Sequence, residues 1–147
     1  MANILAIDTS SAWCSVALSL DGCEPTFRHE RVLAGASQLL LPWVEDMLKQ
    51  NNTSIKDLSA IAVGIGPGAF TGVRLGVAVV QGLAISNQLP VISIASLDAI
   101  AAQASNTDEF KKVMPTINRS IDVFKQNKVD PWYAQAILLI ESPGKTN

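Results

Sequence analysis

The sequence has few of the side chains that build metal centres and nucleophilic sites. His29 is its only histidine, and Cys14 and Cys23 are its only cysteines. A zinc site needs several clustered ligands and a disulfide framework needs more cysteines, so we predict neither. We interpret the cysteines as free thiols of a reducing compartment and His29 as a solvated strand residue.

Charged side chains are also scarce. They make up 16% of the 147 residues, and the net charge is −2. A soluble domain usually has about a quarter of its residues charged, so we expect extra apolar surface and a protein partner that covers it. The composition lacks the excess of lysine and arginine that marks a surface for nucleic acid.

Long apolar runs are missing. No run approaches the roughly 18 residues that a membrane-spanning helix needs. No basic residue precedes the apolar residues of the first segment, MANILAIDTS. We therefore predict neither a spanning helix nor a secretory signal.

What the sequence does contain is an ordered series of strand and helix patterns. Alternating or continuous apolar residues predict three strands, a helix, a strand, a helix, a strand and a last helix, at 3–9, 13–20, 24–33, 37–50, 59–65, 70–86, 90–95 and 96–103. Asp21-Gly22 predicts a two-residue hairpin turn with φ > 0 at both positions. Ser54 with Asp57 predicts a capping box for one short turn. Pro42 is awkward for the first helix unless it lies in the first turn or at a kink.

This order predicts an α/β fold whose sheet has an antiparallel half and a parallel half. From residue 104 onward the chain changes to polar helical segments and a Pro-Gly tail. We therefore predict two regions, an α/β domain at 1–103 and a short helical segment at 104–147.

The segment GIGPGAFTGVRLG, residues 64–76, has five glycines in thirteen residues. It lacks the lysine of a phosphate-binding P-loop and the downstream acid of a dinucleotide fold. Two interpretations are left: an anion site at the backbone N–H groups of residues 68–71, or close packing, which we favour. Mid-helix glycine costs about 1 kcal/mol relative to alanine, so Gly72 and Gly76 predict the close approach of another helix backbone.

Four segments resemble the TsaB (YeaZ) family. They are ILAIDTS near the start, SQLLLP at 37–42, GIGPGAFTGVRLG at 64–76 and SLDAIA at 96–101, and the likeness covers residues 3 to about 103. The resemblance implies an actin/Hsp70-like (ASKHA, RNase H-like) N-terminal lobe with a mixed sheet. It also implies that residues 104–147 are a shortened remnant of the family's second domain.

The same resemblance implies a cytoplasmic, non-catalytic protein without a cofactor, in a family formerly labelled glycoprotease. It implies a role in making threonylcarbamoyladenosine (t6A) on tRNA, as partner of the catalytic subunit TsaD and the ATPase TsaE. A homodimer is expected when the chain is alone, and tRNA is expected to be contacted only indirectly. Family members bind their partners through the helices that match 37–50 and 70–86. We therefore predict an interface at Leu40, Trp43, Val44, Gly72, Leu75, Gly76, Val79 and Leu83, with Trp43 as its best candidate.

Two enzymatic alternatives stay open at this point. An ASKHA-type ATPase or phosphotransferase would use Asp8 to orient Mg²⁺, but Asp8-Thr9-Ser10-Ser11 has no glycine, and Arg74 is the only basic residue near the loop. A peptidase would need a base beside its nucleophile, and His29 is not obviously near any candidate.

Overall fold

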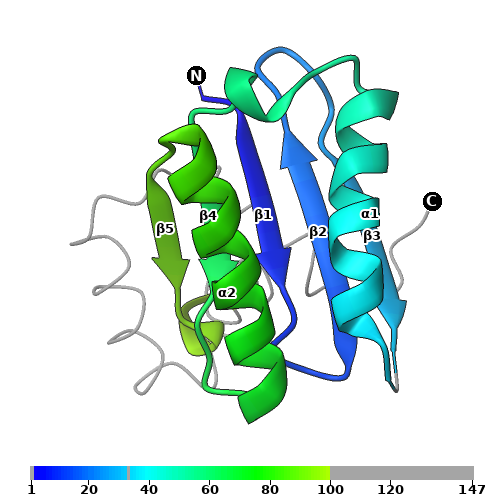
Figure 1. Cartoon of the computed structure of the whole chain (residues 1–147), viewed down its shortest axis with the longest axis vertical. Helices are drawn as coiled ribbons and strands as arrows, with labels where there is room; N and C mark the ends of the chain where they lie inside the picture. The colour runs from blue at the N-terminus through cyan, green and yellow to red at the C-terminus, as the bar shows by residue number, and fades with distance from the viewer. Residues whose placement is uncertain (1, 33, 100–147) are drawn as a thin grey trace, which may run out of the picture.

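The computed structural model describes residues 2–32 and 34–99. Figure 1 shows one sheet with two helices lying across the same face. The elements in chain order are β1 (Ile4–Asp8), β2 (Trp13–Ser19), β3 (Thr26–Arg31), α1 (Ala36–Gln50), the 3-10 turn η1 (Ile55–Asp57), β4 (Ala60–Gly64), α2 (Phe70–Asn87) and β5 (Val91–Ile94). Each predicted strand and helix up to β5 is therefore present, with bounds shifted by one or two residues.

The strand order is β3-β2-β1-β4-β5. β1 pairs antiparallel with β2 and parallel with β4, and β5 continues the parallel half beside β4. This arrangement confirms the predicted mixed sheet. Residues 96–99 are helical, and the rest of the predicted last helix and the segment 104–147 lie outside the described residues.

The main core lies between the sheet and the two helices. Alternate residues of the central strands point toward the helices, as period-2 patterning requires, and α1 contributes five buried side chains, Leu40, Trp43, Val44, Met47 and Leu48. The opposite face of the sheet holds a second buried cluster of small side chains, among them Ala6, Ala17, Ala60 and Ala62.

Pro42 lies inside α1 beyond its first turn, on the exposed side, where its missing N–H removes one helical hydrogen bond without exposing the core. One local prediction needs correction. Asp21 and Gly22 do form a tight turn, in which the Cys23 N–H donates to the Leu20 carbonyl at 3.1 Å. However, only Gly22 has φ > 0 (73°), and β3 begins at Thr26, so the β2–β3 connection is longer than a two-residue hairpin. The Ser54–Asp57 capping box on η1 is confirmed, with both of its hydrogen bonds present.

Candidate functional site

The glycine segment starts at the end of β4, beside the carboxyl end of β1. Gly64 faces Asp8: a Cβ atom at Gly64 would lie 2.5 Å from the Asp8 Oδ2 atom. The other carboxylate oxygen, Asp8 Oδ1, accepts a hydrogen bond of 2.7 Å from the Ser10 backbone N–H. Glycine at position 64 therefore leaves space for a buried carboxylate that holds the β1–β2 turn in place.

Three later glycines of the segment lie against that same β1–β2 turn. Cβ atoms at Gly68 and Gly72 would overlap the backbone carbonyls of Ser10 and Thr9, and one at Gly76 would lie 2.8 Å from Thr9 Oγ1. Two hydrogen bonds fix the contact: Ala69 N–H to the Ser10 carbonyl at 2.6 Å, and Thr9 Oγ1 to the Gly72 carbonyl at 2.5 Å.

The close packing that the glycines predicted is therefore observed, but we were wrong about what approaches them. The backbone at the Gly72–Gly76 face belongs to Thr9 of the same chain, and not to another helix. Thr9 lies more than sixty positions away from Gly72 in the sequence, and no local pattern linked the two. The contact also uses one of the donors that the anion-site interpretation required, because Ala69 N–H is bonded to Ser10.

On the sheet face opposite the helices, three polar side chains form a row across neighbouring strands. Asp8 of β1 is the register partner of Ser15 of β2, and Ser15 is the register partner of His29 of β3. Ser15 Oγ lies 2.5 Å from His29 Nδ1, and the Trp13 ring stacks on the imidazole with 4.3 Å between ring centroids. His29 is therefore half-buried and bonded, and the prediction of a solvated residue was wrong.

The same row places a hydroxyl beside His29, for which the sequence showed no obvious nucleophile nearby. Ser15 is its neighbour, but the order across the strands places the hydroxyl between the carboxylate and the imidazole. A Ser-His-Asp triad requires the imidazole in the middle, where it takes a proton from serine on one side and is oriented by aspartate on the other. Ser15 is also only 2% exposed. The row does not have the geometry of a serine hydrolase.

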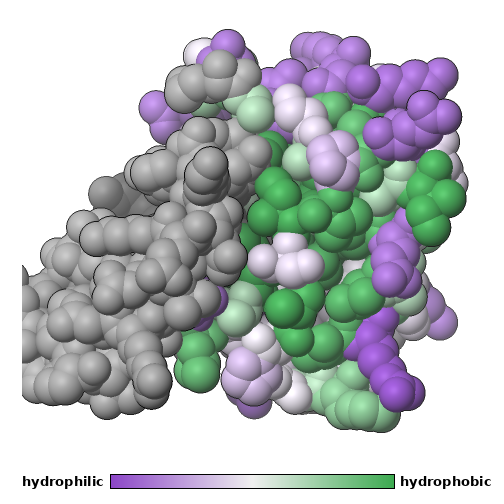
Figure 2. Space-filling model, turned by 90° about the vertical axis from the view of Figure 1, so that its left-hand side faces the viewer, coloured by the Kyte–Doolittle hydropathy of each residue, from purple (hydrophilic) through white to green (hydrophobic). Residues whose placement is uncertain are grey.

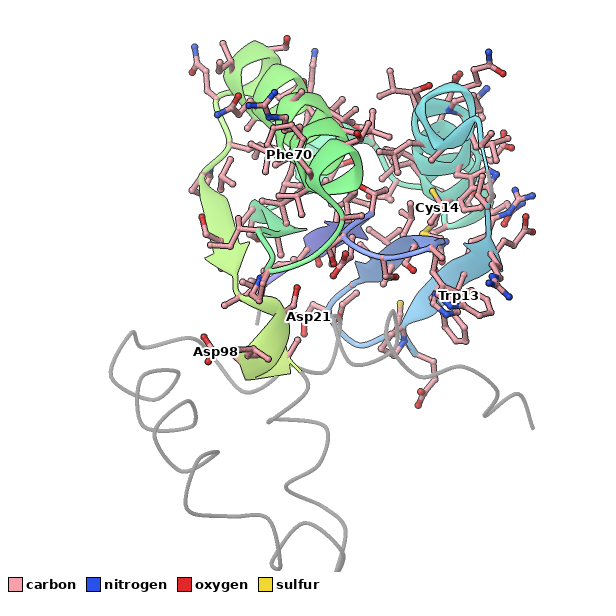
Figure 3. All side chains as sticks on the ribbon, turned by 90° about the horizontal axis from the view of Figure 1, so that it is seen from below. Trp13, Cys14, Asp21, Phe70 and Asp98 are labelled. Carbon is pink, nitrogen blue, oxygen red and sulfur yellow. The ribbon has the colours of Figure 1, made fainter. Side chains whose placement is uncertain are left out.

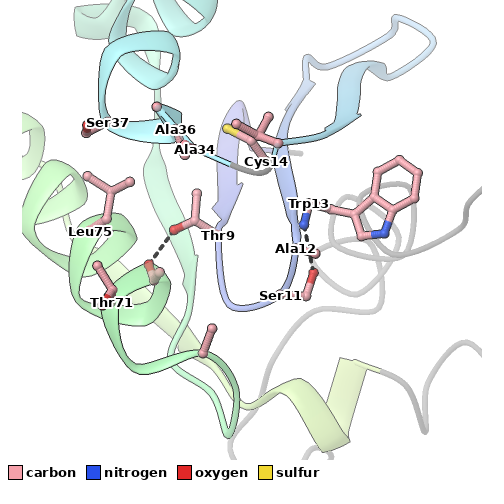
Figure 4. Close-up of a pocket in the computed structure, with 14 residues that line it drawn as sticks. Thr9, Ser11, Ala12, Trp13, Cys14, Ala34, Ala36, Ser37, Thr71 and Leu75 are labelled. Carbon is pink, nitrogen blue, oxygen red and sulfur yellow. Dashed lines mark hydrogen bonds between the residues drawn. The ribbon is translucent and has the colours of Figure 1, made fainter.

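A cavity of about 300 Å³ lies where the first turns of α1 and α2 approach the β1–β2 turn (Figure 4). Its lining residues carry no charge; they are Thr9, Ser11, Ala12, Trp13, Cys14, Val32, Ala34, Gly35, Ala36, Ser37, Ala69, Thr71, Gly72 and Leu75. Neither helix has a side-chain cap at this end.

Cys14, one of the residues that line the cavity, has a thiol with a raised pKa. Burial, with a smaller contribution from Glu30, raises this pKa to about 11, against the opposing effect of Arg28. Cys14 is therefore a neutral thiol at physiological pH. Figure 3 places it between the sheet and α1.

The residues predicted for a partner interface occupy two kinds of position. Leu40, Trp43, Val44 and Gly76 are buried inside this chain, while Gly72, Leu75, Val79 and Leu83 are half-buried. Trp43 is only 3% exposed, and the Arg28 guanidinium lies 4.4 Å from the centroid of its ring. Trp43 thus serves the fold and offers little surface to a partner.

The exposed apolar side chains of the helices are different ones. Leu41 on α1 and Phe70 and Ile85 on α2 are exposed, Ile85 by 79%. Figure 2 shows a broad hydrophobic area on the side that carries α2 and β5, where Val91 is exposed as well. The sequence contained the signal for this surface, because α2 is apolar on nearly all sides and Arg74 is its only ionisable residue. Arg74 lies over the Phe70 ring, 3.9 Å from its centroid.

The described part of the chain lacks two kinds of feature. Residues 2–32 and 34–99 contain no group of three or more histidine, cysteine, aspartate or glutamate side chains placed to hold a metal ion. No helix within those same ranges is both long enough and apolar enough to cross a membrane.

Comparisons with known proteins agree on one family. Residues 31–121 match the family model described as TsaD: tRNA N6-adenosine threonylcarbamoyltransferase. The tRNA threonylcarbamoyladenosine biosynthesis protein TsaB of Escherichia coli K12 is 41% identical over 116 residues, which cover 79% of this chain and 50% of that protein. TsaB of Bacillus subtilis is 34% identical over 114 residues, covering 72% of this chain and 46% of that protein.

Solved structures from Pseudomonas aeruginosa have the same fold. A protein described as similar to peptidase YEAZ superposes with a TM-score of 0.69 at 41% identity, covering 74% of this chain and 50% of that one. A second structure, titled YeaZ, superposes with a TM-score of 0.67 at 43% identity, covering 71% and 48%. The chain thus spans about half the length of the relatives it matches.

Proposed function

Because the chain belongs to the TsaB (YeaZ) family, within the wider family described by the TsaD model, we propose that it is a non-catalytic partner subunit in t6A formation on tRNA. Its mixed α/β sheet is the one that the sequence predicted and is shared with the YeaZ structures, and the family resemblance assigns it to the ASKHA, RNase H-like type. In this proposal the chain binds a TsaD-like catalytic subunit and a TsaE-like ATPase in the cytoplasm, and it pairs with itself when alone. It contacts tRNA only through its partners.

The observation that carries the non-catalytic role is the occupied glycine segment. Loops that cradle phosphate use glycine so that a ligand can approach the backbone closely. Here the space in front of Gly68 and Gly72 is filled by the carbonyls of Ser10 and Thr9. Arg74, the only basic residue of the glycine segment, stacks on the Phe70 ring instead. The segment supports a fixed scaffold better than a phosphoryl-transfer site.

We further propose that the partner binds the outer side of the α1–α2 layer. Leu75, Val79 and Leu83 are half-buried and pack on the main core, and Leu41, Phe70 and Ile85 are exposed on the same two helices. Leu40, Trp43, Val44 and Gly76 then support this surface from below, without contacting the partner. Such a patch, with almost no charge, favours burial against a second protein.

The experiment is a binding assay between this chain and TsaD-like and TsaE-like proteins of the same source, with and without nucleotide. Ile85→Glu and Phe70→Glu place a charge on the proposed surface and should weaken binding to the TsaD-like protein by at least about tenfold. Phe27→Ser is the matched control, because Phe27 is an exposed apolar residue on β3 and pairs with Ala17 of the other sheet face. It should leave binding unchanged.

Two results would overturn the proposal. If the isolated chain bound ATP at micromolar concentration and hydrolysed it, the ASKHA-type ATPase would replace the scaffold role. If the chain bound neither partner, and t6A formation on tRNA in the reconstituted system did not depend on it, the partner role would be lost.

A further inference from the structure

His29 sits on an edge strand, and its contacts come from β2 alone among the strands described. β3 pairs with β2 and has no second neighbour in the sheet order. The imidazole makes two contacts there: Nδ1 lies 2.5 Å from Ser15 Oγ, and the Trp13 ring stacks on it with an interplanar angle of 4°. These contacts hold the middle of β3 against the sheet.

The second ring nitrogen has no such contact. His29 Nε2 is buried and has no hydrogen-bond partner among residues 2–32 and 34–99. A neutral imidazole tolerates this arrangement when Nδ1 carries the proton, because Nε2 is then only a bare acceptor. A protonated imidazole must donate from both nitrogens, which would leave a buried, charged N–H without an acceptor.

The charged groups around the ring do not compensate for that cost. β2 contributes no charged residue, and Arg31 on β3 lies two positions along the same strand face. Arg28 and Glu30 pair with each other on the opposite side of β3. Asp8 of β1 favours the proton but lies beyond Ser15. Burial outweighs it and lowers the pKa of His29 below 6.5.

We propose that His29 is a proton-controlled latch for the edge strand β3. Neutral His29 holds β3 against β2 through Ser15 and Trp13. Protonation moves the ring out toward water, where Nε2–H finds an acceptor, and the β2–β3 ladder opens locally. Because Arg28 of β3 lies over Trp43 of α1, the opening also loosens one contact between the strand and the first helix.

The test is a pH titration of the full chain by NMR. His29 is the only histidine, so its ring signals are unambiguous. They should titrate with a midpoint below 6.5. Over the same pH interval, the hydrogen-exchange protection factors of residues 28–30 should fall by at least about tenfold relative to those of β1.

His29→Gln is the decisive variant, because glutamine can still bond Ser15 but does not titrate. It should abolish the pH dependence of β3 protection. Trp13→Phe keeps an aromatic ring stacked on His29, so the β3 protection factors of this variant should still depend on pH. A wild-type chain whose β3 protection factors do not change through the histidine titration would refute the latch. The latch would also be refuted if the β3 protection factors of His29→Gln fell over the same pH interval as much as those of the wild-type chain.

Discussion

Replacing Gly72 with alanine adds one methyl group to the face of α2 that lies against Thr9. In a free helix this change stabilises by about 1 kcal/mol. Here the new Cβ would overlap a backbone carbonyl, which cannot turn aside as a side chain could. Overpacking of this kind costs about 1–3 kcal/mol, and loss of the Thr9–Gly72 hydrogen bond adds about 1 kcal/mol. We expect a net destabilisation of about 1–3 kcal/mol.

The same helix supplies two matched controls. A Cβ at Gly82 meets nothing within 4 Å, so Gly82→Ala should stabilise by up to about 1 kcal/mol. A Cβ at Gly76 would lie 2.8 Å from the Thr9 side-chain oxygen, so Gly76→Ala should fall between the other two. The three variants thus place one substitution against a backbone, a side chain and open space.

The assay is urea unfolding followed by circular dichroism, with the midpoint and slope compared across the series. The expected order of stability is Gly82→Ala above wild type, then Gly76→Ala, then Gly72→Ala. If Gly72→Ala were as stable as Gly82→Ala, the β1–β2 turn at Thr9 would not constrain the face of α2 that carries Gly72. The structural explanation of the glycines would then be wrong.

Two further predictions follow from buried polar groups. Gly64→Ala places a Cβ 2.5 Å from Asp8 Oδ2, so it should displace the carboxylate and lower the free energy of unfolding by about 1–3 kcal/mol in the same assay. The two cysteines should differ in reactivity, because Cys23 is exposed, whereas Cys14 is buried and has a pKa of about 11. A thiol reagent at pH 8 should therefore modify Cys23 rapidly and Cys14 only after unfolding. Two thiols reacting at equal rates in the folded chain would contradict this.

Local pattern was sufficient for the strands and helices but not for the contacts between them. β1 and β4 are continuous apolar runs, and both are central strands, as such runs predict. The capping box of Ser54 and Asp57 could be predicted because both of its hydrogen bonds lie within four residues. In each of these cases, neighbouring residues contain all the information that the structure uses.

The corrections share the opposite property. The role of Gly72 depends on Thr9, and the burial of His29 depends on strand register that places it opposite Ser15. Sequence spacing predicts which side of a strand or helix a residue occupies, but not which distant segment lies there. Trp43 of α1 shows the same limit, because Arg28 from β3 covers an indole ring that the sequence suggested was available to a partner.

The position of β1 has a consequence for how the chain is made. β1 is synthesised before both of its neighbours in the sheet, and these two strands leave the ribosome at very different times. The partner on one side, β2, follows after a short turn, whereas Ile4 pairs on the other side with Ala60. Non-local pairings of this kind close a long loop and slow folding. The meander of β1, β2 and β3 is therefore complete while one edge of β1 is still open, and translation of β4 sets the moment at which that edge is covered.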